Sequence, residues 1–249
     1  MTGFDIQNLQ TLARLAYPPR CVSCGDMVQS DFGLCGACWG ETPFIGGLVC
    51  EICGVPLPGE AVAGETLHCD ECLTYAHPWQ AGRAALLYRG NARRMVLALK
   101  HGDRQEIVRP AAGWLAGAAG PLLQGDMVVA PVPLHWSRLL RRRYNQAALL
   151  AYALARKVGL PCCPDLLVRI RRTILTDGLG VEQRFATMDA AISAHPRRVN
   201  RLRGRAVLIV DDVMTSGATF AACARACLQA GAQEVRVVAL ARVAKQAWA

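Results

Sequence analysis

The sequence predicts an α/β fold, in which helices flank a mostly parallel β-sheet, preceded by a small cysteine-rich module. Two observations favour this class. Strand-like and helix-like segments alternate after residue 80, and the apolar run at 207–210 is typical of a strand buried on both faces of a parallel sheet. Eight of the twelve cysteines, in contrast, fall within residues 21–72. We therefore expect two domains, residues 1–80 and residues 81–249.

The elements of the second domain follow from apolar spacing and from the residues that end each segment. Gly159, with Pro161 behind it, ends one helix, and Gly231 ends another. Ahead of the cysteines, we expect the first domain to begin with a helix. In the second domain we expect strands at 84–89, 127–132, 207–210 and 235–240, and helices at 91–99, 146–158 and 218–230.

Charge is divided unevenly between the two domains. Residues 1–80 carry two basic and nine acidic side chains, whereas residues 81–249 carry 26 basic and ten acidic ones. Anionic ligands are therefore expected to bind the second domain. No run of eighteen apolar residues is present, and the N-terminal segment lacks the pattern of an export signal. We therefore expect a cytoplasmic protein that is not inserted in a membrane.

The eight clustered cysteines form four Cys-x-x-Cys pairs. Two intervening residues let both thiolates of a pair reach one tetrahedral Zn²⁺, at about 2.3 Å from each sulfur. Eight thiolates are enough for two Cys₄ sites, and such closed sites are structural rather than catalytic. The candidate zinc ligands are Cys21, Cys24, Cys35, Cys38, Cys50, Cys53, Cys69 and Cys72.

The spacing leaves the pairing of these four knuckles open. Short loop closure favours the first with the second and the third with the fourth, but an interleaved arrangement also satisfies the chemistry. His68, beside Cys69, could replace one thiolate. Disulfides and an iron–sulfur cluster are alternative interpretations of the same cysteines, although cytosolic thiols stay reduced.

The most informative motif lies at residues 207–219. An apolar strand delivers Asp211 and Asp212 at its C-terminal end, and a short loop then opens a helix. The unpaired N–H groups of a helix start bind anions, and the hydroxyls of the loop add donors, so the loop suits a phosphate. The carboxylates would repel a phosphate and instead suit sugar hydroxyls, with a divalent metal between them. The loop comprises Thr215, Ser216, Gly217, Ala218 and Thr219.

Competing phosphate motifs are absent from the sequence. There is no G-x-x-x-x-G-K-[ST], which argues against an ATPase of the P-loop kind, and no G-x-G-x-x-G after a strand, which argues against a Rossmann cofactor site. The alternative is an ordinary capped turn between a strand and a helix. Burial of both aspartates in an ion pair, or a turn that faces solid protein with no room for an anion, would favour that alternative.

All thirteen positions of this segment resemble the 5-phosphoribosyl-1-pyrophosphate motif of type I phosphoribosyltransferases. The resemblance implies that fold for the second domain, with Asp211 and Asp212 as catalytic residues that contact the ribose hydroxyls. It also implies that residues 215–219 surround the 5′-phosphate and that Mg²⁺ accompanies the substrate. Pyrophosphate would lie on the loop at 131–135 with Lys100 or Arg143 nearby, while His135 would contact a substrate base or cap a loop.

Four zinc knuckles followed by such a domain are similar to the ComF family. The segments at 88–102 and 132–146 resemble that family's first and second conserved blocks. One block departs, because Thr176 and Thr187 stand where the family has glutamine and asparagine. This block corresponds to the flexible loop that closes over the substrate in type I enzymes. The departure weakens the case for efficient transfer and leaves phosphate binding untouched.

Three functions are compatible with these features, so whether the chain is an enzyme stays open. It could transfer a phosphoribosyl group to an unknown acceptor. The ComF resemblance implies instead a non-catalytic role in DNA uptake during natural transformation, with single-stranded DNA bound by the basic domain and a protein of the uptake machinery as partner. The third function is a sensor that binds phosphoribosyl pyrophosphate without turnover.

Overall fold

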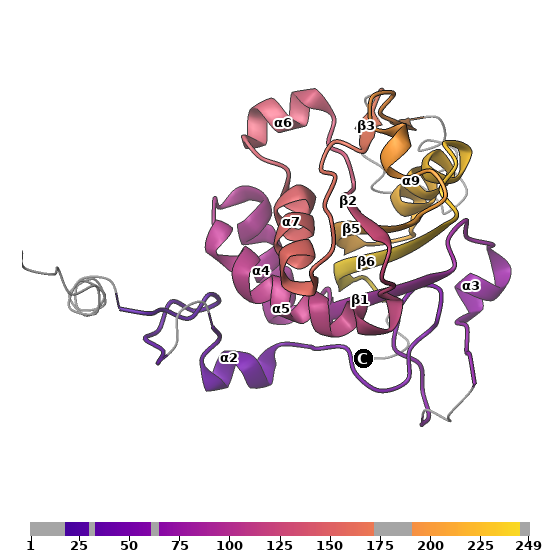
Figure 1. The fold of residues 1–249 in the computed structure, drawn as a ribbon. Coiled ribbons are helices and arrows are strands. Elements are labelled where there is room, and N and C mark those ends of the chain that lie inside the picture. The colour runs from indigo at the N-terminus through magenta and orange to yellow at the C-terminus, as the bar shows by residue number, and fades with distance from the viewer. Residues whose placement is uncertain (1–17, 30–32, 61–64, 172–190, 245–249) are drawn as a thin grey trace, which may run out of the picture.

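A computed structural model of the chain describes residues 18–29, 33–60, 65–171 and 191–244 (Figure 1). The expected N-terminal helix lies outside these residues, as do Thr176 and Thr187. None of the described helices is long and apolar enough to cross a membrane.

A four-stranded parallel sheet forms the centre of the molecule, which confirms the predicted fold class. Its strands are β1 (Ala81–Leu87), β2 (Met127–Pro131), β5 (Ala206–Met214) and β6 (Glu234–Arg242), in the order β1-β6-β5-β2. Each neighbouring pair runs parallel. The continuous apolar runs of β5 and β6 are explained by their central position, where both faces are covered.

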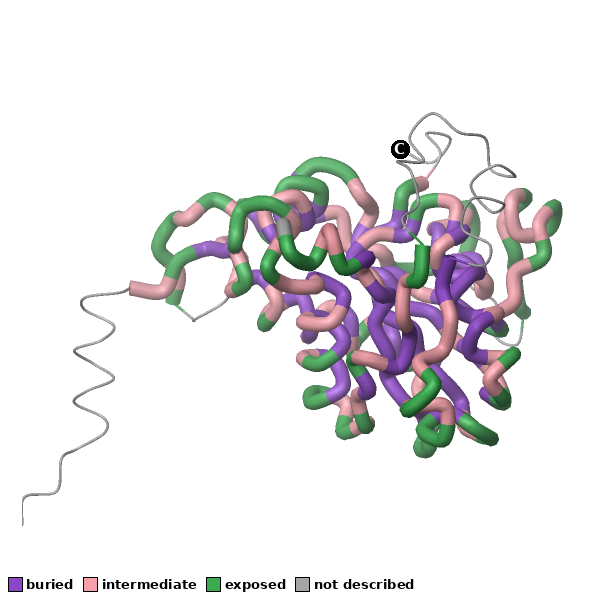
Figure 2. The backbone as a smooth tube through the Cα atoms, turned by 90° about the horizontal axis from the view of Figure 1, so that it is seen from above, coloured by how far each residue is buried: buried purple, intermediate pink, exposed green. Residues whose placement is uncertain are grey.

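Helices cover both faces of this sheet, and the alternation of side chains along β5 defines two cores. Val207 and Ile209 belong to the core that contains α9 (Ala218–Gln229). Leu208 and Val210 belong to the opposite core. Figure 2 shows the buried backbone gathered at the centre and the exposed residues around the rim. The helices of the second core are α4 (Gly90–His101), α5 (Val108–Ala119) and α7 (Gln146–Val158).

Shorter elements complete the described chain. A separate antiparallel sheet pairs β3 with β4, and α6 lies between β2 and α7. Two short helices belong to the cysteine-rich module. The bounds are α2 (Gly36–Glu41), α3 (Asp70–Thr74), α6 (Trp136–Arg142), β3 (Leu167–Arg169), β4 (Ile192–Ala194), and the 3₁₀ helices η1 (Gln105–Ile107), η2 (Gly120–Leu122) and η3 (Val199–Arg201).

Local signals set the ends of α7 as the sequence predicts. Asn145 caps its start, because the Asn145 Oδ1 accepts a hydrogen bond from the Ala147 N–H at 3.0 Å. Gly159 ends it in the left-handed conformation at φ 71°. β5, however, extends further than predicted and reaches Met214. Asp211 and Asp212 therefore lie inside the strand, and the loop that follows begins at Thr215.

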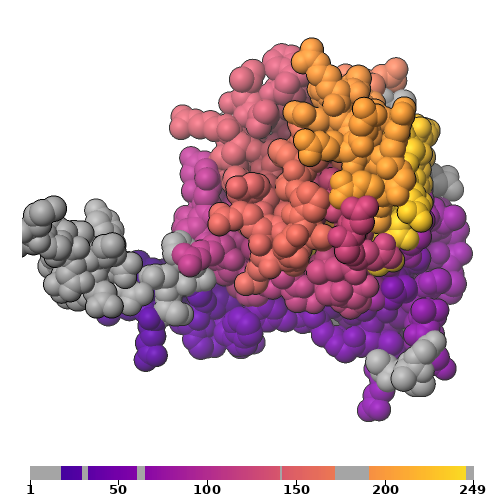
Figure 3. Space-filling view, viewed as in Figure 1, coloured from indigo at the N-terminus to yellow at the C-terminus, as the bar shows by residue number. Residues whose placement is uncertain are grey.

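The N-terminal module lies along one side of the sheet domain (Figure 3). We call residues 21–38 the first ribbon and residues 50–72 the second ribbon. The second ribbon contacts the edge of β1, where the Gly82 N–H donates to the Glu51 carbonyl at 2.8 Å. Cys50 and Cys53 are buried in the same core as α9. The module therefore covers the exposed edge of β1, a position that would otherwise invite pairing with other chains.

Candidate functional site

The eight clustered cysteines form two groups of four, each with all its sulfur atoms within 4.8 Å of one another. The Sγ atoms of Cys24 and Cys35 are 3.7 Å apart, as are those of Cys53 and Cys69. Four sulfurs around Zn²⁺ at about 2.3 Å would be separated by about 3.8 Å, so both groups fit the metal. The groups are Cys21, Cys24, Cys35 and Cys38, and Cys50, Cys53, Cys69 and Cys72.

The sequential pairing favoured by short loop closure is thus confirmed, and the interleaved one is wrong. All twelve cysteines are free thiols, which contradicts the disulfide interpretation. His68 does not belong to either group of four. The left-handed Gly25 and Gly54, at φ 85° and 68°, follow the second cysteine of a knuckle and let the chain turn tightly around the site.

The 215–219 loop joins β5 to α9. Gly217 is the N-cap of α9 at φ 78° and offers no capping side chain, so only the more distant Ser216 Oγ reaches the Ala218 N–H, at 3.5 Å. Thr215 is exposed, Ser216 and Thr219 are half-buried, and Ala218 is buried. On its inner side the loop contacts Trp79. The loop thus combines hydroxyl side chains with the N–H groups of a helix start, which are the donors an anion requires.

Asp211 and Asp212 point to opposite faces of the sheet. Asp212 is buried, with 7% of its surface exposed, and its Oδ1 is 3.1 Å from the Lys100 Nζ at the end of α4. The half-buried Asp211 faces Arg169 and Cys223 on the side of α9. Its Oδ1 accepts a hydrogen bond from the Asp212 N–H at 2.8 Å. Burial, and then repulsion by Asp212, raise the pKa of Asp211 to about 8.

This arrangement removes the repulsion that two carboxylates would exert on a phosphate. The charge of Asp212 is balanced by Lys100, and Asp211 is mostly protonated at neutral pH because its pKa is raised. Only one of the two aspartates is therefore buried in an ion pair. The first condition for an ordinary capped turn, burial of both aspartates in an ion pair, is therefore not met among the described residues.

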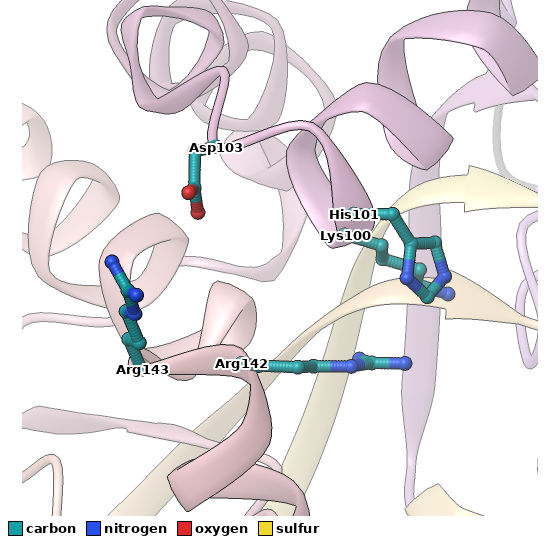
Figure 4. Close-up of a pocket in the computed structure, with 5 residues that line it drawn as sticks. All are labelled: Lys100, His101, Asp103, Arg142 and Arg143. Atoms are coloured by element: carbon teal, nitrogen blue, oxygen red, sulfur yellow. The ribbon is translucent and has the colours of Figure 1, made fainter.

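A pocket of about 620 Å³ opens beside Lys100 (Figure 4). Figure 4 shows Arg142 extending toward Lys100 and His101, while Arg143 lies on the side of Asp103. Asp103 and Arg143 are the two non-glycine residues with positive φ in the described chain, at 50° and 66°. Such backbone conformations are costly and cluster at functional sites. The lining residues are Lys100, His101, Asp103, Arg142 and Arg143.

Hydrogen bonds hold the two walls of this pocket together. The Tyr144 hydroxyl donates to the Leu99 carbonyl at 2.8 Å, and the Gln146 Nε2 donates to the Lys100 carbonyl at 3.4 Å. Arg142 in turn donates to the Gln146 Oε1 at 3.3 Å. The start of α7 thereby fixes the end of α4, which carries the lysine that pairs with Asp212.

His135 has a local role in the structure. It is buried, and its Nδ1 accepts a hydrogen bond from the Ser137 N–H at 3.3 Å, which makes it the N-cap of α6. Of the two roles proposed from the sequence, capping is the one the structure describes. Lys100 and Arg143, both expected near a pyrophosphate, line the same pocket.

Sequence reasoning missed several residues of this region. His101, Asp103 and Arg142 line the pocket, and Trp79 and Arg242 contact the 215–219 loop. Arg242 has a sequence signal, because it directly follows the apolar run at 237–241. Arg142 is one of three consecutive arginines at 141–143, and spacing alone does not single it out.

Two parts of the chain match known protein domains. Residues 12–79 match the double zinc ribbon domain, and residues 145–247 match the phosphoribosyl transferase domain. The chain is 31% identical to the DNA utilization protein YhgH of Salmonella typhimurium over 235 residues, 92% of this chain and 99% of that protein. It is 28% identical to competence protein F of Haemophilus influenzae over 232 residues, 90% of this chain and 96% of that one.

Among solved structures, the glutamine phosphoribosylpyrophosphate amidotransferase of B. subtilis matches with a TM-score of 0.38 at 20% identity, over 55% of this chain and 26% of that one. The chain thus spans about a quarter of that enzyme. The relatives named competence protein F and YhgH, in contrast, match nearly from end to end. The chain therefore belongs to the ComF family, in which a double zinc ribbon precedes a phosphoribosyltransferase domain.

Proposed function

We propose that the chain binds 5-phosphoribosyl-1-pyrophosphate, or a related phosphosugar, with the 5′-phosphate on the 215–219 loop and the pyrophosphate in the cationic pocket. One observation carries the proposal. The Lys100–Asp212 ion pair joins the pocket to the strand that leads into the loop. A ribose whose hydroxyls contact Asp212, on the same face of the sheet as the pocket, would then have an anion-binding loop at one end and several cations at the other.

Mg²⁺ fits this proposal as a partner of the substrate. Outside the cysteines, the described residues contain no group of three side chains that could hold a metal ion. Asp211 and Asp212 face opposite sides of the sheet and do not converge on one point. Mg²⁺ commonly binds through one or two carboxylates together with substrate phosphates. We therefore expect the ion to arrive with the pyrophosphate, whose charge it would neutralise when bound.

Calorimetry with phosphoribosyl pyrophosphate and Mg²⁺ tests the proposal. The double variant Asp211→Asn with Asp212→Asn should bind at least tenfold more weakly, about 1.4 kcal/mol, because the ribose hydroxyls lose the charged acceptor at Asp212. Asp126→Asn is the matched control. Asp126 pairs with Arg205 just before β2 and β5 begin. This is the end of the strands opposite to the 215–219 loop, so the variant should bind like the wild type.

Pyrophosphate alone separates the two halves of the site. The double variant should bind it at least as tightly as the wild type, since Lys100 is released from Asp212. Equal loss of both ligands, or no binding by the wild type, would contradict the proposed arrangement. Release of pyrophosphate in the presence of nucleobases or amines would indicate transfer, whereas binding without release would indicate a sensor.

A second candidate function is the binding of single-stranded nucleic acid. Trp136 and Leu140 on α6 are 66% and 73% exposed and lie one helical turn apart, and Arg143 directly follows this helix. An exposed aromatic ring beside cations is the usual platform for stacking an unpaired base. The names of the relatives, DNA utilization protein and competence protein F, agree with this candidate.

Fluorescence anisotropy with a labelled single strand tests this candidate across salt concentrations. Trp136→Ala should weaken binding by about 1–3 kcal/mol, the usual value of a stacked base. Trp39→Ala is the matched control, because Trp39 is also exposed but lies in α2, next to the first ribbon. Affinity that does not change with salt, or equal loss in both variants, would rule out this binding mode.

A further inference from the structure

The second ribbon reaches the 215–219 loop through Arg242, the last residue of β6. The Arg242 side chain is buried, with 4% of the residue exposed. Its Nη1 donates to the main-chain carbonyls of Met214, Thr215 and Val243, and the first and last of these bonds measure 3.4 and 2.6 Å. Its Nη2 lies 3.8 Å from the Oε2 of Glu71. Glu71 belongs to α3 and lies in the sequence between the zinc ligands Cys69 and Cys72.

These contacts fix the direction of the loop's own donors. In a trans peptide the carbonyl and the following N–H point in opposite directions, and the described chain contains no cis peptide. Arg242 holds the Thr215 carbonyl, and the Met214 carbonyl accepts from Arg242 and, at 2.9 Å, from the Val243 N–H, so the N–H groups of Thr215 and Ser216 point away from Arg242. Those are the donors that an anion on the loop would meet.

A second contact follows an independent route from the same ribbon. The Trp79 Nε1 donates to the Ile52 carbonyl at 2.7 Å, and Ile52 lies between Cys50 and Cys53. The Trp79 ring then packs against Gly217, where an added Cβ would lie 2.9 Å from the ring. Both knuckles of the second ribbon therefore support the loop, one through Arg242 and one through Trp79.

The charge of Glu71 matters more than its distance suggests. Arg242 is a cation with almost no exposure to solvent, and Glu71 is its ion-pair partner in the described chain. A buried cation without a counter-charge is strongly disfavoured, so the position of α3 influences where the guanidinium lies. Zn²⁺ bound by Cys69 and Cys72 would hold the single turn of helix that carries Glu71.

We propose that Arg242 is a positioning residue through which the zinc-bound second ribbon sets the affinity of the 215–219 loop for a phosphate group. The inference rests on the proposed function, since it concerns the same phosphate. The ribbon acts on the binding site without touching the ligand. Arg242 transmits the position of Glu71 to the peptide groups that would hold the anion.

Calorimetry on the full-length protein with ribose 5-phosphate isolates this effect, because that probe carries the 5′-phosphate and lacks the pyrophosphate. Glu71→Gln keeps every cysteine and should weaken binding about fivefold, as expected for loss of a partly buried ion pair. Glu51→Gln is the matched control. Glu51 lies in the same ribbon and pairs with Arg83 of β1, away from the loop, so its affinity should stay within about twofold of wild type.

A conservative substitution of Arg242 tests the same role independently. Arg242→Lys keeps the charge but presents a single ammonium in place of the planar fork, and it should weaken binding about tenfold. Adding Glu71→Gln to Arg242→Lys should then cause little further loss, because both changes act through one contact. Zinc content, measured by mass spectrometry, should remain at two ions per chain in every variant.

The outcomes separate the two proposals. If the wild type binds neither ribose 5-phosphate nor phosphoribosyl pyrophosphate, the proposed function fails and this inference fails with it. If the wild type binds but Glu71→Gln and Glu51→Gln have equal affinity, only the role of Arg242 is refuted. Lower thermal stability in both glutamate variants, with lost affinity in Glu71→Gln alone, would support positioning over a purely structural role.

Discussion

The raised pKa of Asp211 makes a prediction about stability that is independent of any ligand. In the unliganded protein this carboxyl is confined beside Asp212, so its ionisation is opposed by burial and by like charge. Replacement by asparagine keeps the shape and the acceptor of the 2.8 Å bond from the Asp212 N–H, and removes the acid. We therefore expect Asp211→Asn to stabilise the protein, and more so as the pH rises.

The sign and size follow from the two pKa values. The native pKa, about 8, exceeds the ordinary value of 3.8, so between these pH values the native state binds more protons than the unfolded state. Its free energy of unfolding falls as the pH rises through this window. Each pKa unit corresponds to about 1.4 kcal/mol, which sets an upper limit of about 6 kcal/mol. Relaxation around Asp211 lowers the expected gain at pH 8 to about 2 kcal/mol, or about 4–8 °C in melting temperature.

Urea unfolding at half-unit steps between pH 5 and 8.5 measures this difference. The wild type and Asp211→Asn should converge at the acidic end and diverge toward pH 8. Asp212→Asn should instead destabilise the protein. It leaves the partly buried Lys100 without its counter-charge, which should lower the free energy of unfolding by about 2 kcal/mol. Parallel curves for the wild type and Asp211→Asn would refute the assignment of a protonated Asp211.

Three further predictions concern the scaffold of the site, and urea midpoints measure each of them. Gly217→Ala should lower the free energy of unfolding by about 2 kcal/mol, because φ is 78° and the new Cβ would meet Trp79. Gly204→Ala is the control: φ is 67° but the space around it is open, so the loss should be only about 1 kcal/mol. Tyr144→Phe should cost about 1 kcal/mol by removing the hydroxyl bond to the end of α4, and a value near zero would mean that the pocket walls are held otherwise. Cys227→Ser should lower the free energy of unfolding by about 1–3 kcal/mol more than Cys227→Ala, because it buries a hydroxyl among the apolar residues of α9.

Strong local signals made much of the fold predictable. The run at 207–210 is uniformly apolar because β5 is covered on both faces, and α7 carries both its cap and its terminating glycine. The pairing of the zinc knuckles follows from the lower entropic cost of short loops. Cys223 and Cys227, one helical turn apart, lie in the core as their alanine neighbours suggest.

Other elements depend on contacts distant in sequence. α5 contains Pro110, Gly113 and Gly117, which lower its helix propensity, yet Pro110 lies in the first turn, where its missing N–H has no partner to lose. Packing of Leu115 and its neighbours against the sheet stabilises the helix despite this low propensity. β3 and β4 are three residues each and pair across a long separation, so neither strand has a pattern of its own.

The candidate site also combines features that the local sequence predicts with contacts that it does not. Spacing identified the loop and the two aspartates, since all lie within one short segment. The Lys100–Asp212 pair joins residues more than a hundred positions apart, and the Glu71–Arg242 contact spans a still longer separation. Such pairs arise only when the sheet brings distant strands together, which no local pattern encodes.

The strand order has a consequence for how the molecule is made. β6 is the last of the described strands to leave the ribosome, yet it lies between β1 and β5. Until residues 234–242 emerge, β1 has no strand partner and the nascent sheet contains an open slot. The ribbons, whose last cysteine is Cys72, are synthesised long before that moment. Metal uptake can therefore precede closure of the sheet, with the ribbon already seated against β1 when the final strand arrives.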